Sequence, residues 1–367
     1  MRGIAGDGSA ADRHGAAAAM SGSAKRRRRA HVAGVTAALA RGEWRWLARA
    51  AWRLVQLRVA PGRARPLFAT LAVTWRCNYR CTFCDLPDRA RGDPPLATLV
   101  ERLTAIAASG ALAVGLTGGE PLLHPQLFEV IAAARRLGLL VHLNSNGSRL
   151  TEAAVAPLLA SGLHSINLSL DGATAATHDA LRRVPGSFAQ IERTVRALLA
   201  ARRRGSPRLA LVMAVGAENA GEVAPFLAVA RAWGVDGAGF LPHHEFVGPR
   251  APLPPASVAK LASALAAVAD DPLQDNSPAY LGAIAPFLDG APMPQQCSAP
   301  ASHLAIDPDG VRYPCVPLMT LTRGGSPLAA GAPPPLPADL REEVCRRCWW
   351  NCHRELDLSL HRLAAPR

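Results

Sequence analysis

The stretch "TWRCNYRCTFCDLP", residues 74–87, places Cys77, Cys81 and Cys84 within eight positions, with the spacing C-x3-C-x2-C. It follows an apolar run, residues 68–73, that has the composition of a buried strand, so the cysteines are expected on the loop after it. Three thiolates can hold three irons of a [4Fe–4S] cluster and leave the fourth open to another ligand. Zinc held by three cysteines and a water is the alternative, although no histidine follows before His124.

Short apolar segments alternate with Ala- and Leu-rich segments along the chain from residue 68 onward. Continuous apolar strands joined by helical crossovers are typical of a parallel sheet that is covered on both faces. Six such units are compatible with a doubly wound sheet or with an open, incomplete barrel. We expect strands at 68–75, 111–116, 139–144, 165–170, 208–215 and 237–241, and helices at 95–109, 124–137, 151–161, 187–203 and 218–233.

Polar residues follow most of the expected strands at the point where each strand ends. In a barrel of parallel strands, the carboxyl ends converge on one mouth, and the chemistry is found there. The pattern therefore favours an α/β fold of the barrel type over a doubly wound sheet. The polar segments are the cysteine loop, Thr117–Pro121, Asn144–Gly147, Ser169 with Asp171, and His243–Glu245.

Two motifs together, "CNYRCTFC" after the first strand and "LTGGEP" after the second, resemble the signature of the radical S-adenosylmethionine (SAM) superfamily over residues 68–245. The resemblance implies an incomplete (β/α)6 TIM-like barrel and a [4Fe–4S] cluster on Cys77, Cys81 and Cys84. It further implies that the amino and carboxylate groups of SAM chelate the open iron. Reductive cleavage of SAM would then yield methionine and a 5′-deoxyadenosyl radical, which abstracts hydrogen from a substrate.

The same resemblance implies roles for eight further residues around SAM. Gly118 and Gly119 would allow close backbone approach, so that the backbone and Glu120 meet the methionine ammonium. Hydroxyls of the two serines would reach the ribose or the carboxylate, and the backbone of Phe83 would lie against the adenine. Arg208 would pair with the SAM carboxylate, with Arg182 competing for that role. The predicted SAM-binding residues are Phe83, Gly118, Gly119, Glu120, Ser145, Ser169, Arg182 and Arg208.

A second cysteine group lies near the carboxyl end of the sequence. The stretch "AIDPDGVRYPC", residues 305–315, follows Cys297 and ends with Cys315. It predicts a hairpin with an Asp-Gly turn that brings the two thiols together. Cys345, Cys348 and Cys352 follow with C-x2-C-x3-C spacing. The arrangement resembles SPASM and Twitch auxiliary-cluster domains, with five cysteines where a full SPASM domain has seven. It implies one auxiliary [4Fe–4S] cluster, and a zinc site on four of the five cysteines is the alternative.

The positive charge is concentrated near the amino end. The chain has a formal net charge of +13, and residues 1–66 hold fourteen Lys and Arg against three acids, so a nucleic-acid partner is not indicated. Residues 43–59 predict an amphipathic helix. It either packs on the main domain, lies on an anionic membrane surface or docks a partner. Its basic side is Arg45, Arg49 and Arg53, and its apolar side is Trp44, Leu47, Ala51, Leu54 and Val55.

These features predict five segments and a cytoplasmic radical SAM enzyme that draws electrons from a low-potential donor of the flavodoxin or ferredoxin type. The substrate is expected to be a peptide or protein, a small molecule or a lipid, and His243, His244 and Glu245 are candidate acid–base residues. A non-catalytic iron–sulfur or zinc protein on the same barrel is the alternative. The segments are 1–30 (disordered, basic), 31–66 (helical extension), 67–250 (barrel), 251–296 (linker with helices) and 297–367 (auxiliary-cluster domain).

Overall fold

The computed structural model contains two compact units, residues 1–51 and 52–367, and the second holds the sheet and both cysteine groups. The expected segment 1–30 and residues 31–43 lie outside the described part of the chain. So do His244 and Glu245. The structure describes residues 44–60, 64–84, 86, 91–203, 205–243, 253–291, 297–321, 345 and 348–364.

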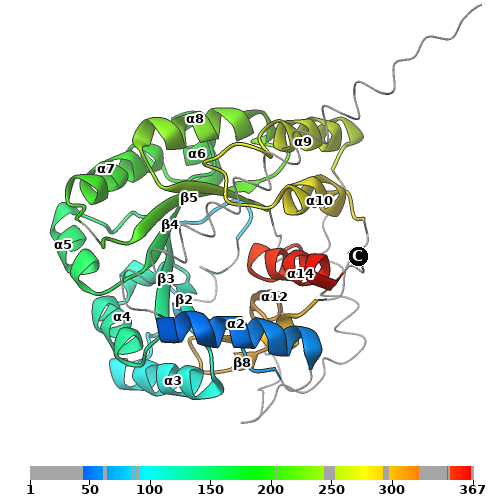
Figure 1. The fold of residues 1–367 in the computed structure, drawn as a ribbon. Coiled ribbons are helices and arrows are strands. Elements are labelled where there is room, and N and C mark those ends of the chain that lie inside the picture. The colour runs from blue at the N-terminus through cyan, green and yellow to red at the C-terminus, as the bar shows by residue number, and fades with distance from the viewer. Residues whose placement is uncertain are drawn as a thin grey trace, which may run out of the picture. The chain divides into compact units, whose positions relative to one another are not determined.

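The centre of the fold is a twisted sheet in which six strands run parallel in chain order (Figure 1). All six predicted strands are present within two residues of their expected ends. Because the sheet order is linear, the barrel is open, as the sequence predicts. The strands are β1 (Phe68–Thr74), β2 (Ala113–Gly118), β3 (Leu140–Ser145), β4 (Ser165–Ser169), β5 (Arg208–Val215) and β6 (Gly237–Pro242).

Helices cover the outer face of this sheet (Figure 1), and the five predicted helices are all found. Alternate strand residues, such as Leu71, Leu116 and Leu143, are fully buried in one apolar core with the helices. The structure adds α6 before α7, and two helices lie in the segment 251–296 that was expected to be a linker with helices. The helices are α3 (Leu96–Ser109), α4 (Leu127–Arg136), α5 (Glu152–Ala160), α6 (Ala175–Arg182), α7 (Ser187–Ala200), α8 (Val223–Trp233), α9 (Pro255–Ala267) and α10 (Pro278–Leu288).

The inner face of the sheet carries polar and small residues. On β3 and β4, His142 contacts Ser165 (Nδ1 to Oγ, 2.7 Å) and Asn144 (Nε2 to Oδ1, 3.1 Å), and Asn167 donates to the same Asn144 oxygen at 3.3 Å. Burial lowers the pKa of His142 to about 4, so its ring is neutral at pH 7. The concave side of the open barrel is therefore polar, whereas its outer side is apolar.

The predicted hairpin after Cys297 forms, and it extends the barrel sheet. Strand β7 (His303–Ile306) pairs parallel with β1, and β8 (Arg312–Tyr313) pairs antiparallel with β7. Asp307 closes the turn by accepting hydrogen bonds from the backbone N–H groups of Asp309 and Val311. The segment expected as a separate auxiliary domain thus begins inside the main sheet.

Helix α14 (Asn351–Ala364) packs beside α10 (Figure 1). Tyr280 and Trp349 stack with ring centroids 5.6 Å apart, and each donates a hydrogen bond to the other's backbone carbonyl. Glu355 of α14 accepts a hydrogen bond from the Ser277 backbone N–H at the start of α10. These contacts fix the segment around Cys348 against the body of residues 52–367.

Helix α2 (Trp44–Val59) is the helix that the sequence predicts over 43–59. It contains four arginines and no acidic residue. Within the described residues, no helix combines the length and the apolar character that a membrane crossing requires.

Candidate active site

The cysteine loop leaves the carboxyl end of β1 and is held at both ends. Arg76 donates to Asp93 (Nε to Oδ1, 3.0 Å) and to the Leu123 carbonyl (2.6 Å), and Thr74 also donates to Asp93. Further along, the Thr82 N–H donates to the Leu181 carbonyl at the end of α6 (2.9 Å). The thiols of the loop are thus carried by a braced segment and not by a free loop.

Cys77, Cys81 and Cys84 are all partly exposed, and none of them forms a disulfide. Burial raises the pKa of Cys77 to about 11 and raises the pKa of Cys81, although the Tyr79 N–H and Arg182 oppose these shifts. Thiolate ligation to iron overrides such a shift, because a bound metal deprotonates the thiol. Three thiols on one braced loop beside a buried cation fit an anionic iron–sulfur cluster.

The glycines of "TGGEP" are required by backbone contact with the start of the cysteine loop. Gly118 has φ of 137°, and a Cβ there would lie 2.2 Å from the Thr74 carbonyl oxygen. A Cβ on Gly119 would lie 2.2 Å from the Arg76 carbonyl oxygen. The N–H groups of Gly119 and Glu120 donate to those same two carbonyls at 2.9 and 2.8 Å. The two loops are therefore joined backbone to backbone.

Glu120 and Ser145 meet each other at this junction. The Glu120 side chain accepts hydrogen bonds from the Ser145 hydroxyl (2.8 Å) and from the N–H groups of Asn146 (2.7 Å) and Leu122 (3.0 Å). Burial raises the pKa of Glu120, and the hydrogen bonds oppose that shift. Glu120 is 1% exposed and Ser145 is 3% exposed. Both side chains therefore join β2 to β3 in this structure, and their contacts with SAM stay a prediction.

Arg182 contacts both the cysteine loop and the segment after β4. Its Nε is 2.6 Å from Oδ2 of Asp171, and its Nη1 faces the Cys81 sulfur at 3.6 Å. The guanidinium also lies over the Phe83 ring, 5.7 Å from its centroid. Burial disfavours the charged form, but Asp171 and Cys81 hold the pKa of Arg182 above its usual range. The cation is thus fixed between the end of β4 and the cysteine loop.

Arg208 does not reach this cluster, which corrects the primary sequence prediction for the SAM carboxylate. It is the first residue of β5, paired with the first residue of β4, and therefore lies at the amino-terminal edge of the sheet, opposite the cysteine loop. There it is exposed and forms an ion pair with Asp275 at 2.7 Å. Of the two candidate arginines, only Arg182 stands at the carboxyl ends of the strands.

Two further predicted residues lie at the mouth. The His243 ring, at the end of β6, stacks on the Phe83 ring with centroids 4.4 Å apart, and Nδ1 is 3.7 Å from Glu218. Ser169 ends β4 and is half-buried on the inner face. The backbone N–H of Asp171 donates a hydrogen bond to Nδ1 of the fully buried His178 (3.0 Å). The sequence alone does not reveal this contact.

Of the second cysteine group, Cys315 and Cys348 are buried, and Cys297 and Cys345 are partly exposed. Burial raises the pKa of Cys297 to about 12 and that of Cys348 to about 11, and it raises the pKa of Cys315 well above its usual value. The thiols of Cys348, Cys297 and Cys345 add to the shift of Cys315. The side chain of Cys352 is outside the described part of the structure.

A buried ion pair spans this second cluster. Arg354 and Asp357 are 1% and 2% exposed, with Nη1 3.0 Å from Oδ2. Asp357 also accepts from the Ser298 N–H (2.8 Å), next to Cys297, and Arg354 lies over the Trp349 ring, next to Cys348. Within the described residues, no three His, Cys, Asp or Glu side chains are arranged to hold a single metal ion.

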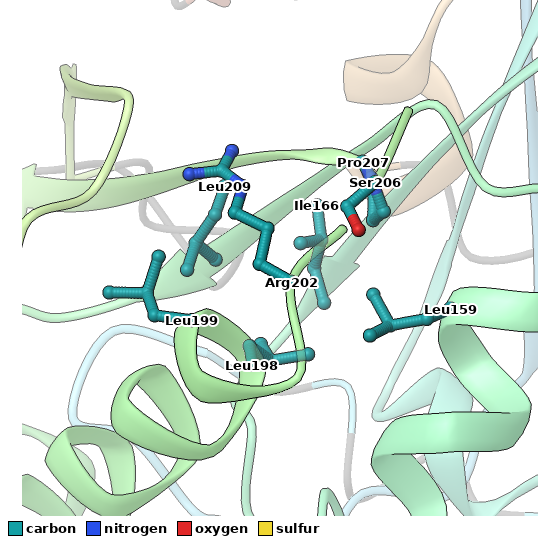
Figure 2. Close-up of a pocket in the computed structure, with 8 residues that line it drawn as sticks. All are labelled: Leu159, Ile166, Leu198, Leu199, Arg202, Ser206, Pro207 and Leu209. Atoms are coloured by element: carbon teal, nitrogen blue, oxygen red, sulfur yellow. The ribbon is translucent and has the colours of Figure 1, made fainter. Parts of the chain in front are cut away.

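A pocket elsewhere in the molecule is separate from both clusters. Figure 2 shows it between α5, α7 and the amino-terminal ends of β4 and β5, where leucines predominate. Because the strands are parallel, this is the end opposite the cysteine loop. The lining residues are Leu159, Ile166, Leu198, Leu199, Arg202, Ser206, Pro207 and Leu209.

Comparison with known families identifies the domain that carries the first cluster. The model of the radical SAM superfamily matches residues 71–229, which include the cysteine loop, the "TGGEP" segment and Arg182. Residues 71–229 are a radical SAM domain.

Individual relatives are similar to between 39% and 50% of the chain. The AdoMet-dependent heme synthase of Methanosarcina barkeri is 33% identical over 151 residues, 39% of this chain and 41% of that protein. The PqqA peptide cyclase of Gluconobacter oxydans is 31% identical over 186 residues, 50% of this chain and 51% of that protein. The chain thus spans about half the length of these relatives or less.

The fold of the radical SAM domain also occurs in a solved structure. Streptococcus suis SuiB, bound to its precursor peptide SuiA, has a TM-score of 0.57 with this chain at 16% identity. The similarity covers 72% of this chain and 62% of SuiB. At this level of identity the likeness concerns the fold.

Proposed function

We propose that this protein is a radical SAM enzyme that cleaves SAM reductively and abstracts a hydrogen atom from its substrate. The observation that carries the proposal is the braced loop of Cys77, Cys81 and Cys84 at the barrel mouth, beside the buried Arg182 cation. When bound there, a [4Fe–4S] cluster would pass one electron to SAM, giving methionine and a 5′-deoxyadenosyl radical that becomes 5′-deoxyadenosine on taking hydrogen from the substrate.

The residues of the mouth would bind and orient SAM. Arg182 supplies a fixed positive charge for the SAM carboxylate, and Ser169 supplies a hydroxyl on the same inner face. Phe83 and His243 form an aromatic pair against which the adenine could lie. Glu120 and Ser145 hold the ends of β2 and β3 next to the cysteine loop. Their removal would therefore disturb the structure of the site in addition to any direct contact that they make with SAM.

We further propose an auxiliary [4Fe–4S] cluster on four of the five carboxyl-terminal cysteines. Five cysteines within residues 297–352 support it, and the hairpin of β7 and β8 forms between the first two of them. Four irons at each site predict about eight irons per chain. About four irons with one zinc would instead assign zinc to the second site.

A peptide is the substrate class that we favour. One relative is a cyclase of the PqqA peptide, and SuiB binds a precursor peptide. The proposed role of the cysteines as cluster ligands suits the reducing cytosol, where a flavodoxin or ferredoxin would supply the electron. We also propose a peripheral membrane contact, for which α2 is the candidate element.

The decisive experiment removes the first cluster alone. After anaerobic reconstitution and reduction with dithionite, wild-type protein should convert SAM to 5′-deoxyadenosine and methionine. The Cys77→Ala/Cys81→Ala/Cys84→Ala variant should form neither product while it retains the iron of the second site. Continued SAM cleavage by this variant would disprove the assignment. A wild-type protein that binds both clusters but never cleaves SAM would indicate the non-catalytic iron–sulfur alternative.

A further inference from the structure

Exposed large apolar side chains are concentrated on one helix. Within the described residues, Leu137 is the single example outside α2. Trp52 is 60% exposed and Val59 is 76% exposed, far more than the core residues of the same types. The full set on α2 is Trp44, Trp52, Leu54, Val55 and Val59.

Four of these side chains form one continuous strip. Trp44, Trp52, Val55 and Val59 are separated by eight, three and four residues, which places them on one face of a helix with 3.6 residues per turn. The exposed Ala48 fills the gap between the two tryptophans. We call these five residues the apolar strip. It differs from the apolar side that the sequence predicts, because Leu54 projects from a different side of the helix.

The charge of α2 is arranged around this strip. Arg49 and Arg58 are exposed and flank it on its two sides at helical spacing. Leu57, on the opposite face, is buried, at 6% exposed. One face of the helix thus holds a buried leucine, and another presents tryptophan and valine between arginines.

We propose that the apolar strip lies on an anionic phospholipid surface. Interfacial helices place Trp and aliphatic side chains at the acyl boundary, with Arg or Lys beside them at the level of the headgroups. This helix has that composition and no acidic residue. The basic segment 1–66 adds to the attraction, with fourteen Lys and Arg against three acids. The inference makes the proposed peripheral contact specific and is independent of SAM chemistry.

A second copy of this chain fits the strip less well. Two such helices packed face to face would bring four or more arginines together without an acidic partner on either helix. Anionic lipid headgroups neutralise the same arginines, and the headgroup region accommodates both the tryptophan rings and the guanidinium groups. Charge complementarity thus selects a lipid surface as the occupant.

The test is co-sedimentation of the purified full-length protein with vesicles. One set contains equal parts of phosphatidylglycerol and phosphatidylcholine, and the other contains phosphatidylcholine alone. Three variants are compared with wild type: Trp52→Gln/Val59→Gln in the strip, Arg49→Gln/Arg58→Gln beside it, and Leu137→Gln as the matched exposed apolar control. Sedimentation without vesicles measures self-association of the protein. The formation of 5′-deoxyadenosine without vesicles measures the SAM-cleavage activity of each variant.

We expect wild type and Leu137→Gln to pellet with anionic vesicles at low salt, to remain in solution with neutral vesicles, and to be released by high salt. Each double variant should bind the anionic vesicles at least about tenfold more weakly than wild type. Its SAM cleavage should be unchanged. Failure of wild type to pellet at low salt, equal binding to neutral vesicles, or full binding by the strip variant would overturn the proposal. So would a wild-type dimer without vesicles that the strip variant converts to a monomer.

Discussion

The Nε of Arg182 lies 2.6 Å from the Oδ2 of Asp171, in a pair of which the aspartate is fully buried. The other side of the guanidinium faces the Cys81 sulfur. A single buried cation thus joins the end of β4 to the cysteine loop. The contrast with Arg208, whose partner Asp275 is 44% exposed at the far edge of the sheet, gives the first prediction.

Arg182→Met should lower the free energy of unfolding by about 3–5 kcal/mol, because it leaves the Asp171 carboxylate buried without its partner. It should also abolish or strongly reduce SAM cleavage. Arg208→Met, the matched control, should cost about 1 kcal/mol or less and keep the activity. Denaturant unfolding and 5′-deoxyadenosine formation measure the two effects. Equal losses in the two variants would contradict the placement of Arg182 at the site.

Gly118→Ala should disrupt the junction between the first two strand ends. Its Cβ would lie 2.2 Å from the Thr74 carbonyl oxygen, at a φ of 137° that side chains rarely adopt. We expect a loss of about 2 kcal/mol or more in unfolding free energy, with loss of iron from the first site. Gly92→Ala has no atom within 4 Å of its new Cβ and should be nearly neutral. A Gly118→Ala protein with wild-type stability and iron would contradict the backbone contact.

Arg354→Met should impair the second metal site, because the ion pair with Asp357 links the peptide after Cys297 to the segment after Cys348. In the variant that lacks Cys77, Cys81 and Cys84, iron should fall well below about four per chain. Arg231→Met, which breaks an exposed pair with Asp271, is the control and should retain that iron. Arg354→Lys should recover part of the loss. Undiminished iron in Arg354→Met would show that the pair has no part in the site.

His178→Gln should change how stability depends on pH. Burial lowers the pKa of His178 to about 4, whereas an unfolded histidine titrates near 6.5. The neutral ring of His178 therefore makes its full contribution to the unfolding free energy above about pH 6.5. This contribution, up to about 3 kcal/mol, is lost as the pH falls from about 6.5 to 4. Glutamine can still accept from the Asp171 N–H but does not titrate. The difference between the unfolding free energies at pH 7.5 and pH 4.5 should thus be smaller in the variant than in wild type. If the two proteins show the same pH dependence, a group other than His178 causes the loss of stability at low pH.

The fold was largely readable from the sequence because the six strands are apolar runs between helical segments, and their order in the sheet follows the chain. The cysteine loop was readable because its three thiols are close in sequence. Arg182 and Asp171 are eleven residues apart, and Arg354 and Asp357 are three apart, yet the composition of a segment does not reveal that such groups are buried. The choice between Arg182 and Arg208 depended on which end of a strand each occupies.

Other features could not be predicted because they join segments that are distant in sequence. Glu120 bonds Ser145 through a contact between two strand ends, and His178 orients Asp171 across a helix start. On α2, periodicity indicated one apolar side but not which residues would be covered: Trp44 and Val55 of that side are exposed, and Leu57 is buried.

The pairing of β7 with β1 makes the first and last parts of the sheet dependent on each other during synthesis. The ribosome must release the chain beyond Ile306 before β1 has a neighbour on both sides, although β1 carries the first cysteine loop. Until then, the outer edge of β1 is an open strand that other chains could pair with. A chain truncated before His303 would keep that edge permanently, so we expect the radical SAM segment alone to aggregate when expressed without its carboxyl-terminal hairpin.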